Sequence, residues 1–194
     1  MVKIKQQKII KKFLHEEFED EGLLIFKRQE LFLQNSIKRT NGKTKNQMKT
    51  LIQTILPRIA LYQALVEHIA KKEEVYNIMR KYMLNVVAAQ KHVSTSKMEI
   101  IPGFFYIYRT VFLIIMRTTD LQKSILERGK GYYDITITKC LWHDACLEHE
   151  CLELCPLFCD VDDVTYGGLK KIGFTRTETL GYGGDCCDFH FFKK

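Results

Sequence analysis

The chain has 194 residues, a formal net charge of +7, and a composition that is 46% hydrophobic and 27% charged. This length suits one domain with a sizeable core, and the balance of apolar and charged residues argues against an intrinsically disordered chain. We therefore expect a single domain over residues 1–194, with a helical part (1–130) followed by a cysteine-rich part (131–194).

The excess positive charge lies mainly between Lys3 and Lys49, where basic residues mix with acids such as Glu16, Glu17 and Glu21. Mixed charge of this kind is typical of a solvated helix face. The first segment also lacks interleaved aromatic residues on which bases would stack. We expect no nucleic-acid partner, and the sequence indicates no particular oligomeric state.

The longest apolar run, residues 100–116, contains Pro102, Gly103 and Arg109 and is short for a membrane span. It predicts a buried helix and no membrane association. Residues 1–12 are charged and lack the apolar stretch of a secretory signal. We expect a cytoplasmic protein, in which cysteines are thiols or metal ligands rather than disulfides.

Helical periodicity dominates the chain up to about residue 130. Two amphipathic helices are expected before a polar gap at residues 41–47, and further apolar residues recur at three- and four-residue steps over 51–69 and 75–87. Pro57 is expected to kink or divide the first of these later segments.

The period changes from 3.6 to 2 after residue 130. Alternation at 131–139 predicts a strand with Tyr133, Ile135 and Ile137 on one face. Residues 173–180 and 186–192 alternate likewise across a glycine-rich connection that is typical of a hairpin. The fold class predicted is α+β, with a helical N-terminal part followed by a small antiparallel sheet and a packed helix.

Five of the seven cysteines lie at positions 140, 146, 151, 155 and 159. No C-x2-C pair occurs, so the spacing of a local zinc or iron–sulfur motif is absent. Pro156 suits a first helical position and predicts a helix from there to about residue 167. Cys159, Asp162 and Asp163 would then lie within one turn of each other, near a helix start that favours anions. The alternative is a half-buried cysteine beside two solvated aspartates.

Cys140 ends the first predicted strand and Cys187 opens the last. If both strands belong to one sheet, Cys140, Cys159 and Cys187 can converge. Three thiols with Asp162 or His143 would suit Zn²⁺ or Fe²⁺, so Cys140, His143, Cys159 and Cys187 form a tentative metal set. The sequence does not specify the cofactor.

The same residues resemble the C-terminal signature of the L-2-amino-thiazoline-4-carboxylic acid hydrolase family. The matches run in order over "C140LWHDAC", "C151LELCPLFCDVDD" and "FTRTETLGYGGDCCDF". The matching positions are Cys140, Glu153, Leu154, Phe158, Cys159, Asp162, Arg176, Thr179, Leu180, Gly183, Cys187, Asp188 and Phe189.

The resemblance implies a hydrolase that opens a small cyclic amidine or amide ring, such as a thiazoline, by attack of water. It implies a small-molecule substrate, with Cys159 or Cys187 as nucleophile or metal ligand and Asp162 as base or ligand. Arg176 would pair with the substrate carboxylate. Thr179, Gly183 and Gly184 would complete the substrate site, with the glycine amides facing the developing negative charge.

The sequence departs from the family pattern in its extra cysteines (Cys146, Cys151, Cys155 and Cys186) and in Leu141-Trp142, where a proline-containing turn is expected. We interpret Cys146, Cys151 and Cys155 as packing or accessory thiols. Two rival functions follow from the same thiols. One is a cysteine-rich metal- or ligand-binding sensor without turnover, and the other is a structural cluster whose basic N-terminal helices contact a partner.

Overall fold

The computed structural model describes residues 4–194, so Lys3, one of the basic residues noted above, lies outside the described part of the chain. The chain divides into two compact units. One comprises residues up to Met79 together with Ala145–Leu154, and the other comprises Arg80–Asp144 and Cys155–Lys194. The single-domain expectation stays a prediction.

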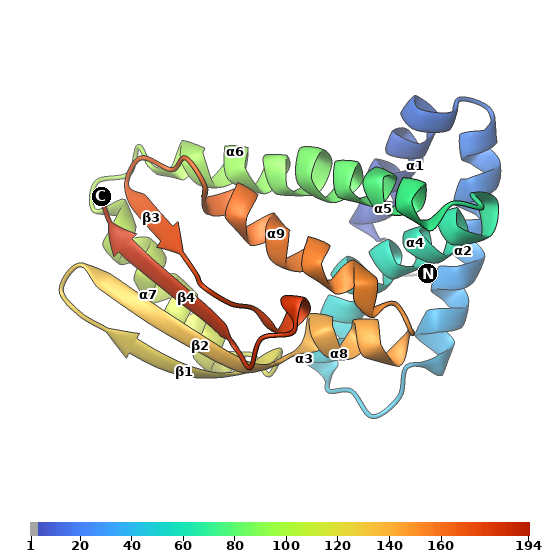
Figure 1. Ribbon diagram of the computed structural model, residues 1–194. Helices are drawn as coiled ribbons and strands as arrows, with labels where there is room; N and C mark the ends of the chain where they lie inside the picture. Colours follow the sequence, from blue (N-terminus) through green and yellow to red (C-terminus); the bar gives the residue numbers. More distant parts are fainter. Residues whose placement is uncertain (1–3) are drawn as a thin grey trace. The chain divides into compact units, whose positions relative to one another are not determined.

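The first unit is helical (Figure 1). Its elements are α1 (Lys5–Phe18), α2 (Glu21–Arg39), α3 (Lys45–Thr50), a π-helical segment (Leu51–Ile55), α4 (Leu56–His68), the beginning of α5 (Lys72–Lys81), the end of α8 (Leu141–Glu148) and a 3-10 turn (Leu152–Leu154). The two amphipathic helices before the polar gap are confirmed as α1 and α2. Pro57 stands in the first turn of α4, directly after the π-helical segment, so the helical hydrogen bonding changes type where a kink or division is expected, while the backbone stays helical.

A buried amide ties three helical segments of this unit together. Gln29 of α2 is fully buried, and its side chain exchanges hydrogen bonds with that of Gln7 in α1 at 2.9 and 3.0 Å. It also donates to the carbonyl of Pro57 in α4 at 3.1 Å. A buried amide costs stability unless it is paired, so these bonds fix how α1, α2 and α4 pack.

The second unit combines helices with a sheet (Figure 1). After the end of α5 come a π-helical segment (Tyr82–Ala88), α6 (Ala89–Met98), α7 (Phe104–Thr118), β1 (Gln122–Arg128), β2 (Tyr132–Cys140), the beginning of α8, α9 (Cys155–Tyr166), β3 (Ile172–Thr175), a 3-10 turn (Leu180–Tyr182) and β4 (Cys187–Lys193). The strands form one antiparallel sheet in the order β1-β2-β4-β3. The α+β class and the antiparallel sheet are confirmed.

The sequence missed one strand and overestimated another. β1 lies in the region that the sequence assigned to the helical part. It was missed because its half-buried, charged sequence lacks a clean alternation. β3 ends at Thr175 rather than near residue 180. There the carboxylate of Asp188 accepts the backbone N–H groups of Thr177 and Glu178, which therefore cannot continue the strand ladder.

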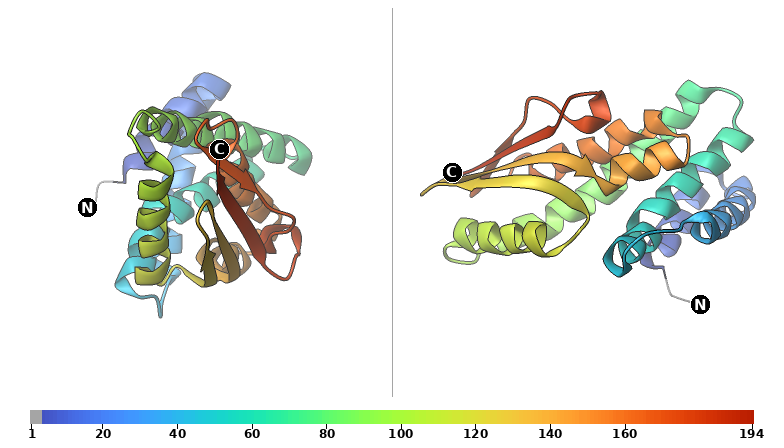
Figure 2. Two further views of the ribbon diagram at one scale, coloured as in Figure 1. Left: turned by 90° about the vertical axis from the view of Figure 1, so that its left-hand side faces the viewer. Right: turned by 90° about the horizontal axis from the view of Figure 1, so that it is seen from below.

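The helix expected to be buried, α7, is buried on one side only. Phe104, Phe105 and Leu113 belong to the core, whereas Ile107 and Ile114 are about half exposed. α7 runs along the β1–β2 hairpin (Figure 2). An arginine inside this apolar run is accommodated because Arg109 donates to the carbonyl of Gly129, in the turn between the two strands, at 2.7 Å. The apolar run therefore forms a helix as expected, and only one side of it is buried, because hydrophobicity alone does not reveal the width of the covered face.

An aromatic layer forms the centre of the second unit. Tyr133 of β2 and Phe191 of β4, partners in the sheet register, stack with their centroids 4.7 Å apart. Tyr166, at the end of α9, meets Phe191 edge-to-face at 4.9 Å, and Phe112 of α7 packs on it at 5.5 Å. Aromatic pairs of this geometry add stability beyond their buried area, so Phe191 joins both helices to the sheet.

Replacement of Phe191 by alanine is expected to destabilise the second unit by about 3–5 kcal/mol, because the cavity would lie where α7, α9 and the sheet meet. Urea unfolding followed by the fluorescence of Trp142, the single tryptophan, would measure the change. Phe192→Ala is the control. That side chain lies half-buried on the opposite face of β4, so it should cost clearly less, and equal losses would contradict the central role of Phe191.

Candidate functional site

One face of α9 carries the chemistry-bearing residues of the second unit. Cys155, Cys159, Asp162 and Tyr166 follow each other at steps of four, three and four, which places them on one side of a helix. Because Tyr166 packs on Phe191, this side faces the sheet and the segment between β3 and β4. The predicted helix from Cys155-Pro156 to about residue 167 is confirmed.

The segment between β3 and β4 lies directly on this face. A Cβ atom added to Gly181 would stand 2.6 Å from Cys159 Sγ and 3.2 Å from the carbonyl oxygen of Cys155. Thr179 is only 2% exposed, hydrogen-bonds to the Cys159 thiol, and caps the 3-10 turn by accepting the N–H of Tyr182 at 3.3 Å. Only glycine allows the backbone to approach the thiol so closely. Gly181 is therefore a residue of this site that the sequence analysis did not identify.

Two acidic side chains hold the segment in shape. Asp188 accepts the N–H groups of Thr177 and Glu178 at 2.9 and 2.8 Å and the Thr177 hydroxyl at 2.6 Å. Partial burial of Asp188 would raise its pKa, but these hydrogen bonds outweigh that effect and lower the pKa. Glu178 in turn accepts the Asp185 N–H at 3.0 Å and the Cys186 thiol at 3.3 Å.

The predicted thiols of the site are held in their protonated form. A hydrogen bond with Cys155, together with burial, raises the pKa of Cys159 well above its ordinary value, and the bond with Thr179 opposes that shift. Burial also raises the pKa of Cys187, although its Sγ accepts the N–H of Leu180 at 3.4 Å. Each of these thiols therefore needs a base before it can attack as thiolate.

Cys140 lies at the end of β2, as predicted, with its sulfur near the backbone N–H groups of Trp142 and His143. Burial raises its pKa to about 11 in spite of these two hydrogen bonds. Ionised Cys187 or Cys155 would raise that pKa further, so the thiols lie near enough to influence one another electrostatically. Cys187 is thus an electrostatic neighbour of both Cys140 and Cys159, and the expected convergence of all three thiols stays a prediction.

Cys155 is a further member of this group that the sequence assigned to packing. It is 2% exposed, begins α9, and hydrogen-bonds to the Cys159 thiol. A cysteine at a helix start, four residues before another thiol, was the available signal, since the helix dipole favours a thiolate there. Cys146 and Cys151, by contrast, belong to the first unit and are buried, as expected of packing thiols.

Asp162 is the carboxyl group with the most unusual surroundings on this face. Burial raises its pKa to about 6, while the positive charges of Lys91 and Arg176 oppose the shift. The hydroxyl groups of Tyr108 and Tyr166 are joined by a 3.1 Å hydrogen bond. Burial raises the pKa of both hydroxyls, and the negative charge of Asp162 raises it further. A carboxylate with a pKa near neutrality is well suited to exchange protons at physiological pH.

Arg176 is already engaged by groups of its own chain. Its guanidinium donates to the carbonyl of Cys159 at 3.2 Å, forms a close ion pair with Asp163, and lies 3.8 Å from Asp160. The side chain of Asp163 is 49% exposed, whereas that of Arg176 is 10% exposed. The arginine therefore joins the end of β3 to α9, and Asp163 is the more exposed of its two aspartate neighbours.

The glycine amides expected to face a developing negative charge have partners within the loop. The Gly183 N–H donates to the carbonyl of Leu180 at 3.2 Å, and the Gly184 N–H donates to that of Thr179 at 2.9 Å. Gly183 has a φ of 83°, which a residue with a side chain rarely adopts. These glycines shape the loop, and their amides are not free donors in this conformation.

Across residues 4–194, no group of three or more His, Cys, Asp or Glu side chains is arranged to hold a metal ion. The tentative set of Cys140, His143, Cys159 and Cys187 is thus not gathered into such a group. His143 offers Cys140 its backbone N–H, while its ring Nδ1 lies 3.9 Å from Asp144. All seven cysteines are free thiols.

The family model of L-2-amino-thiazoline-4-carboxylic acid hydrolase matches residues 45–191. The chain belongs to this family, which confirms the resemblance drawn from the cysteine segment. The match covers the helices from α3 onward, the first three strands and β4 as far as Phe191. None of the curated proteins matches the chain.

Two solved structures resemble it over nearly the whole length. One is the crystal structure of an Fe(II) unliganded H-NOX protein from K. algicida, with 10% identity, coverage of 97% of this chain and 96% of that chain, and a TM-score of 0.33. The other is an H-NOX protein from S. oneidensis in the Fe(II)NO ligation state, with 12% identity, 96% and 98% coverage, and a TM-score of 0.35. Neither likeness is close enough to bear on function.

Within the described residues, every helix is too short or too polar to cross a bilayer.

The close contact at Gly181 gives a direct test of the site geometry. Gly181→Ala is expected to destabilise the second unit by about 1–3 kcal/mol, because the added methyl group must push the Cys159 thiol or the α9 backbone aside. Urea unfolding monitored by Trp142 fluorescence would measure this. Gly131→Ala is the matched control, since a Cβ there meets no atom within 4 Å. Equal stability of the two variants would contradict the packing of the loop on α9.

Proposed function

We propose that this member of the hydrolase family opens a small cyclic amidine or amide ring of the thiazoline type at the face of α9 that carries Cys159 and Asp162. The observation that carries the proposal is the placement of these two residues one turn apart. Both interact electrostatically with Cys187 at the start of β4, and Arg176 donates to the carbonyl of Cys159. A thiol, a carboxylate and a cation beside a shaped loop are the groups that ring opening requires.

The reaction begins at the ring carbon bonded to nitrogen and sulfur. The Cys159 sulfur adds to this carbon, the ring carbon–sulfur bond breaks, and the ring sulfur leaves and takes up a proton. The carbon is then held on Cys159 as an isothiourea. Water adds to that carbon, the bond to Cys159 breaks, and the products are an open-chain urea with a free thiol and the restored Cys159 thiol.

Asp162 is proposed as the base of both steps. Because burial raises the pKa of Asp162 to about 6, the carboxylate is mostly ionised at pH 7 and still basic enough to accept a proton. It takes the proton from Cys159 in the first step and from water in the second. Cys187, which accepts the Leu180 N–H, is proposed to position the loop beside the reacting carbon.

Arg176 is proposed to bind the substrate carboxylate. The substrate carboxylate would replace the exposed Asp163 carboxylate as the partner of the guanidinium. The hydrogen bond from Arg176 to the Cys159 carbonyl would keep the guanidinium oriented. Thr179, Gly183 and Gly184 would form the wall of the substrate site by their shape.

Free thiols suit a reducing compartment, and we propose that the protein acts in the cytoplasm.

The assignment can be tested by turnover of 2-amino-thiazoline-4-carboxylate. Cys159→Ala and Asp162→Asn are each expected to lower kcat by about 100-fold or more, because each removes a group that acts on the reacting atoms. In the unaltered chain, kcat/KM should rise with pH through about 6, as Asp162 loses its proton. Cys146→Ala, a buried thiol of the first unit, should retain activity.

Full activity of Cys159→Ala would contradict the covalent route. Saturable binding of the compound with no turnover by any variant or by the unaltered chain would favour the sensor function instead. A pH profile that keeps its rise near 6 in Asp162→Asn would assign the base to another group.

A functional carboxylate kept in an unfavourable place should also affect stability. The pKa of Asp162 is about 6 in the folded chain and about 3.8 when exposed. Ionisation of the buried group therefore lowers the free energy of unfolding above pH 6, and this loss is absent below pH 3.8. Asp162→Asn is therefore expected to stabilise the second unit by about 1–3 kcal/mol at pH 7. The gain should vanish near pH 4. Urea unfolding at both pH values measures it, and a loss of stability at pH 7 would contradict the burial argument.

A further inference from the structure

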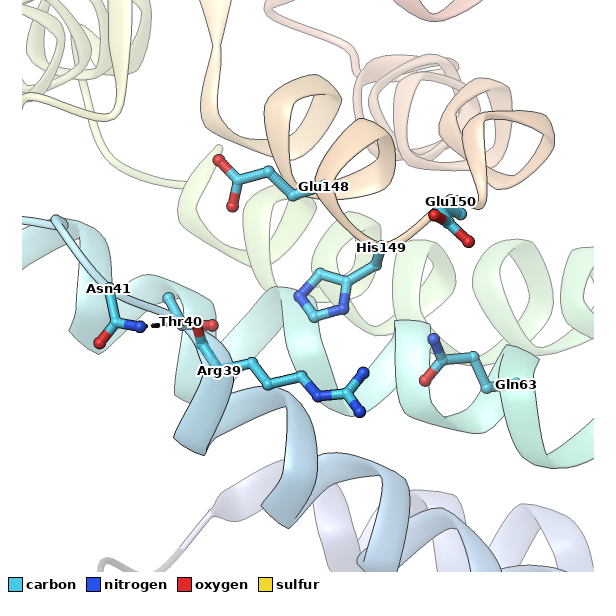
Figure 3. A pocket seen from close by; sticks show the side chains of 7 residues that line it. All are labelled: Arg39, Thr40, Asn41, Gln63, Glu148, His149 and Glu150. Carbon is cyan, nitrogen blue, oxygen red and sulfur yellow. Dashed lines mark hydrogen bonds between the residues drawn. The ribbon is translucent and has the colours of Figure 1, made fainter.

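A cavity in the first unit is lined by polar side chains that the proposed reaction does not use. It has a volume of about 450 Å³ and is bounded by residues 39–41 at the end of α2, Gln63 of α4, and residues 148–150 at the end of α8. Figure 3 shows the Arg39 guanidinium extending toward Gln63, with the His149 ring directed into the same space. Such a volume suits a small metabolite.

The charges around the cavity are balanced and of opposite sign. Glu148 forms a close ion pair with Lys43. Arg39 and Glu150 also line the cavity, and within residues 4–194 neither side chain forms an ion pair. One unpaired cation and one unpaired anion therefore face the same space. A ligand with a single sign of charge would meet one favourable and one unfavourable partner there.

His149 adds a neutral donor and acceptor to this pair. Burial lowers its pKa, Glu148 opposes that shift, and the positive charges of Arg39 and Lys43 lower the pKa further. The imidazole is thus uncharged at neutral pH and offers one N–H and one free nitrogen. With the amide of Gln63, it can hydrogen-bond a polar ligand without changing the charge balance.

The backbone at Glu150 supplies independent evidence that this side chain serves a purpose. α8 ends in a Schellman motif, in which Cys151 donates to the carbonyl of Cys146 at 2.9 Å and Glu150 donates to that of Leu147 at 3.1 Å. Glu150 occupies the left-handed position of this motif, with a φ of 54°. Glycine is the favoured residue there, and a glutamate is strained. Strained residues of this kind cluster at ligand-binding sites.

We propose that this cavity binds a free amino acid, whose carboxylate pairs with Arg39 and whose protonated amine pairs with Glu150. A zwitterion satisfies both unpaired charges at once. A compact polyanion such as phosphate would meet Glu148 and Glu150. The proposal concerns residues of the first unit alone and does not depend on the proposed reaction at Cys159.

Calorimetric titration of the whole chain with each of the twenty standard L-amino acids tests the proposal. At least one is expected to bind saturably and to raise the thermal unfolding midpoint. Its N-acetylated form, which lacks the charged amine, and its amide, which lacks the carboxylate, should each bind about tenfold more weakly or worse. Binding of none of the twenty, equal binding of the blocked forms, or binding of inorganic phosphate alone would overturn the proposal.

Variants separate a ligand role from a structural one. Arg39→Gln and Glu150→Gln are expected to weaken binding about tenfold or more, whereas Lys38→Gln, the neighbouring basic residue that does not line the cavity, should bind as the unaltered chain does. Glu150→Gly should raise the unfolding midpoint of the free chain by about 2–4 °C, since glycine relieves the strained backbone, and should also lose binding. Unchanged affinity in Arg39→Gln and Glu150→Gln would overturn the assignment.

Discussion

The contact of Tyr166 with Phe191 decides how the candidate site is built. Because Tyr166 lies on the same side of α9 as Cys155, Cys159 and Asp162, anchoring it edge-to-face on the sheet turns all of them toward the β3–β4 segment. A rotation of α9 by one residue position would move both thiols and the carboxylate away together. The aromatic layer is therefore the structural basis of the site as well as the core of the second unit.

Burial then sets the protonation states that the proposed chemistry uses. The thiols of Cys159 and Cys187 stay protonated, because they lie away from water and near other acidic groups. The same environment raises the pKa of Asp162 to about 6, which keeps it ionised but basic at neutral pH. A low-dielectric environment thus divides these groups into proton donors and one proton acceptor, which is the division that the proposed reaction requires.

The sequence located much of this arrangement because local rules govern it. Proline after Cys155 marked the start of α9, and period-two alternation identified β2 and its buried face. The same rules failed where long-range contacts dominate. β1 was missed because its pairing with β2 outweighs a weak pattern. β3 was drawn too long because Asp188, thirteen residues beyond its end, captures the backbone that would have continued it.

By itself, then, the sequence determined the α+β class, the family, and that Cys159 and Asp162 share a helix turn, since these follow from spacing along the chain. Only the tertiary structure decided that Gly181 lies against the Cys159 thiol, that Asp163 occupies the Arg176 guanidinium, and that Arg39 and Glu150 face one cavity. The reason is physical. Each of these contacts joins residues from different elements, and their meeting depends on packing and burial that no local pattern encodes.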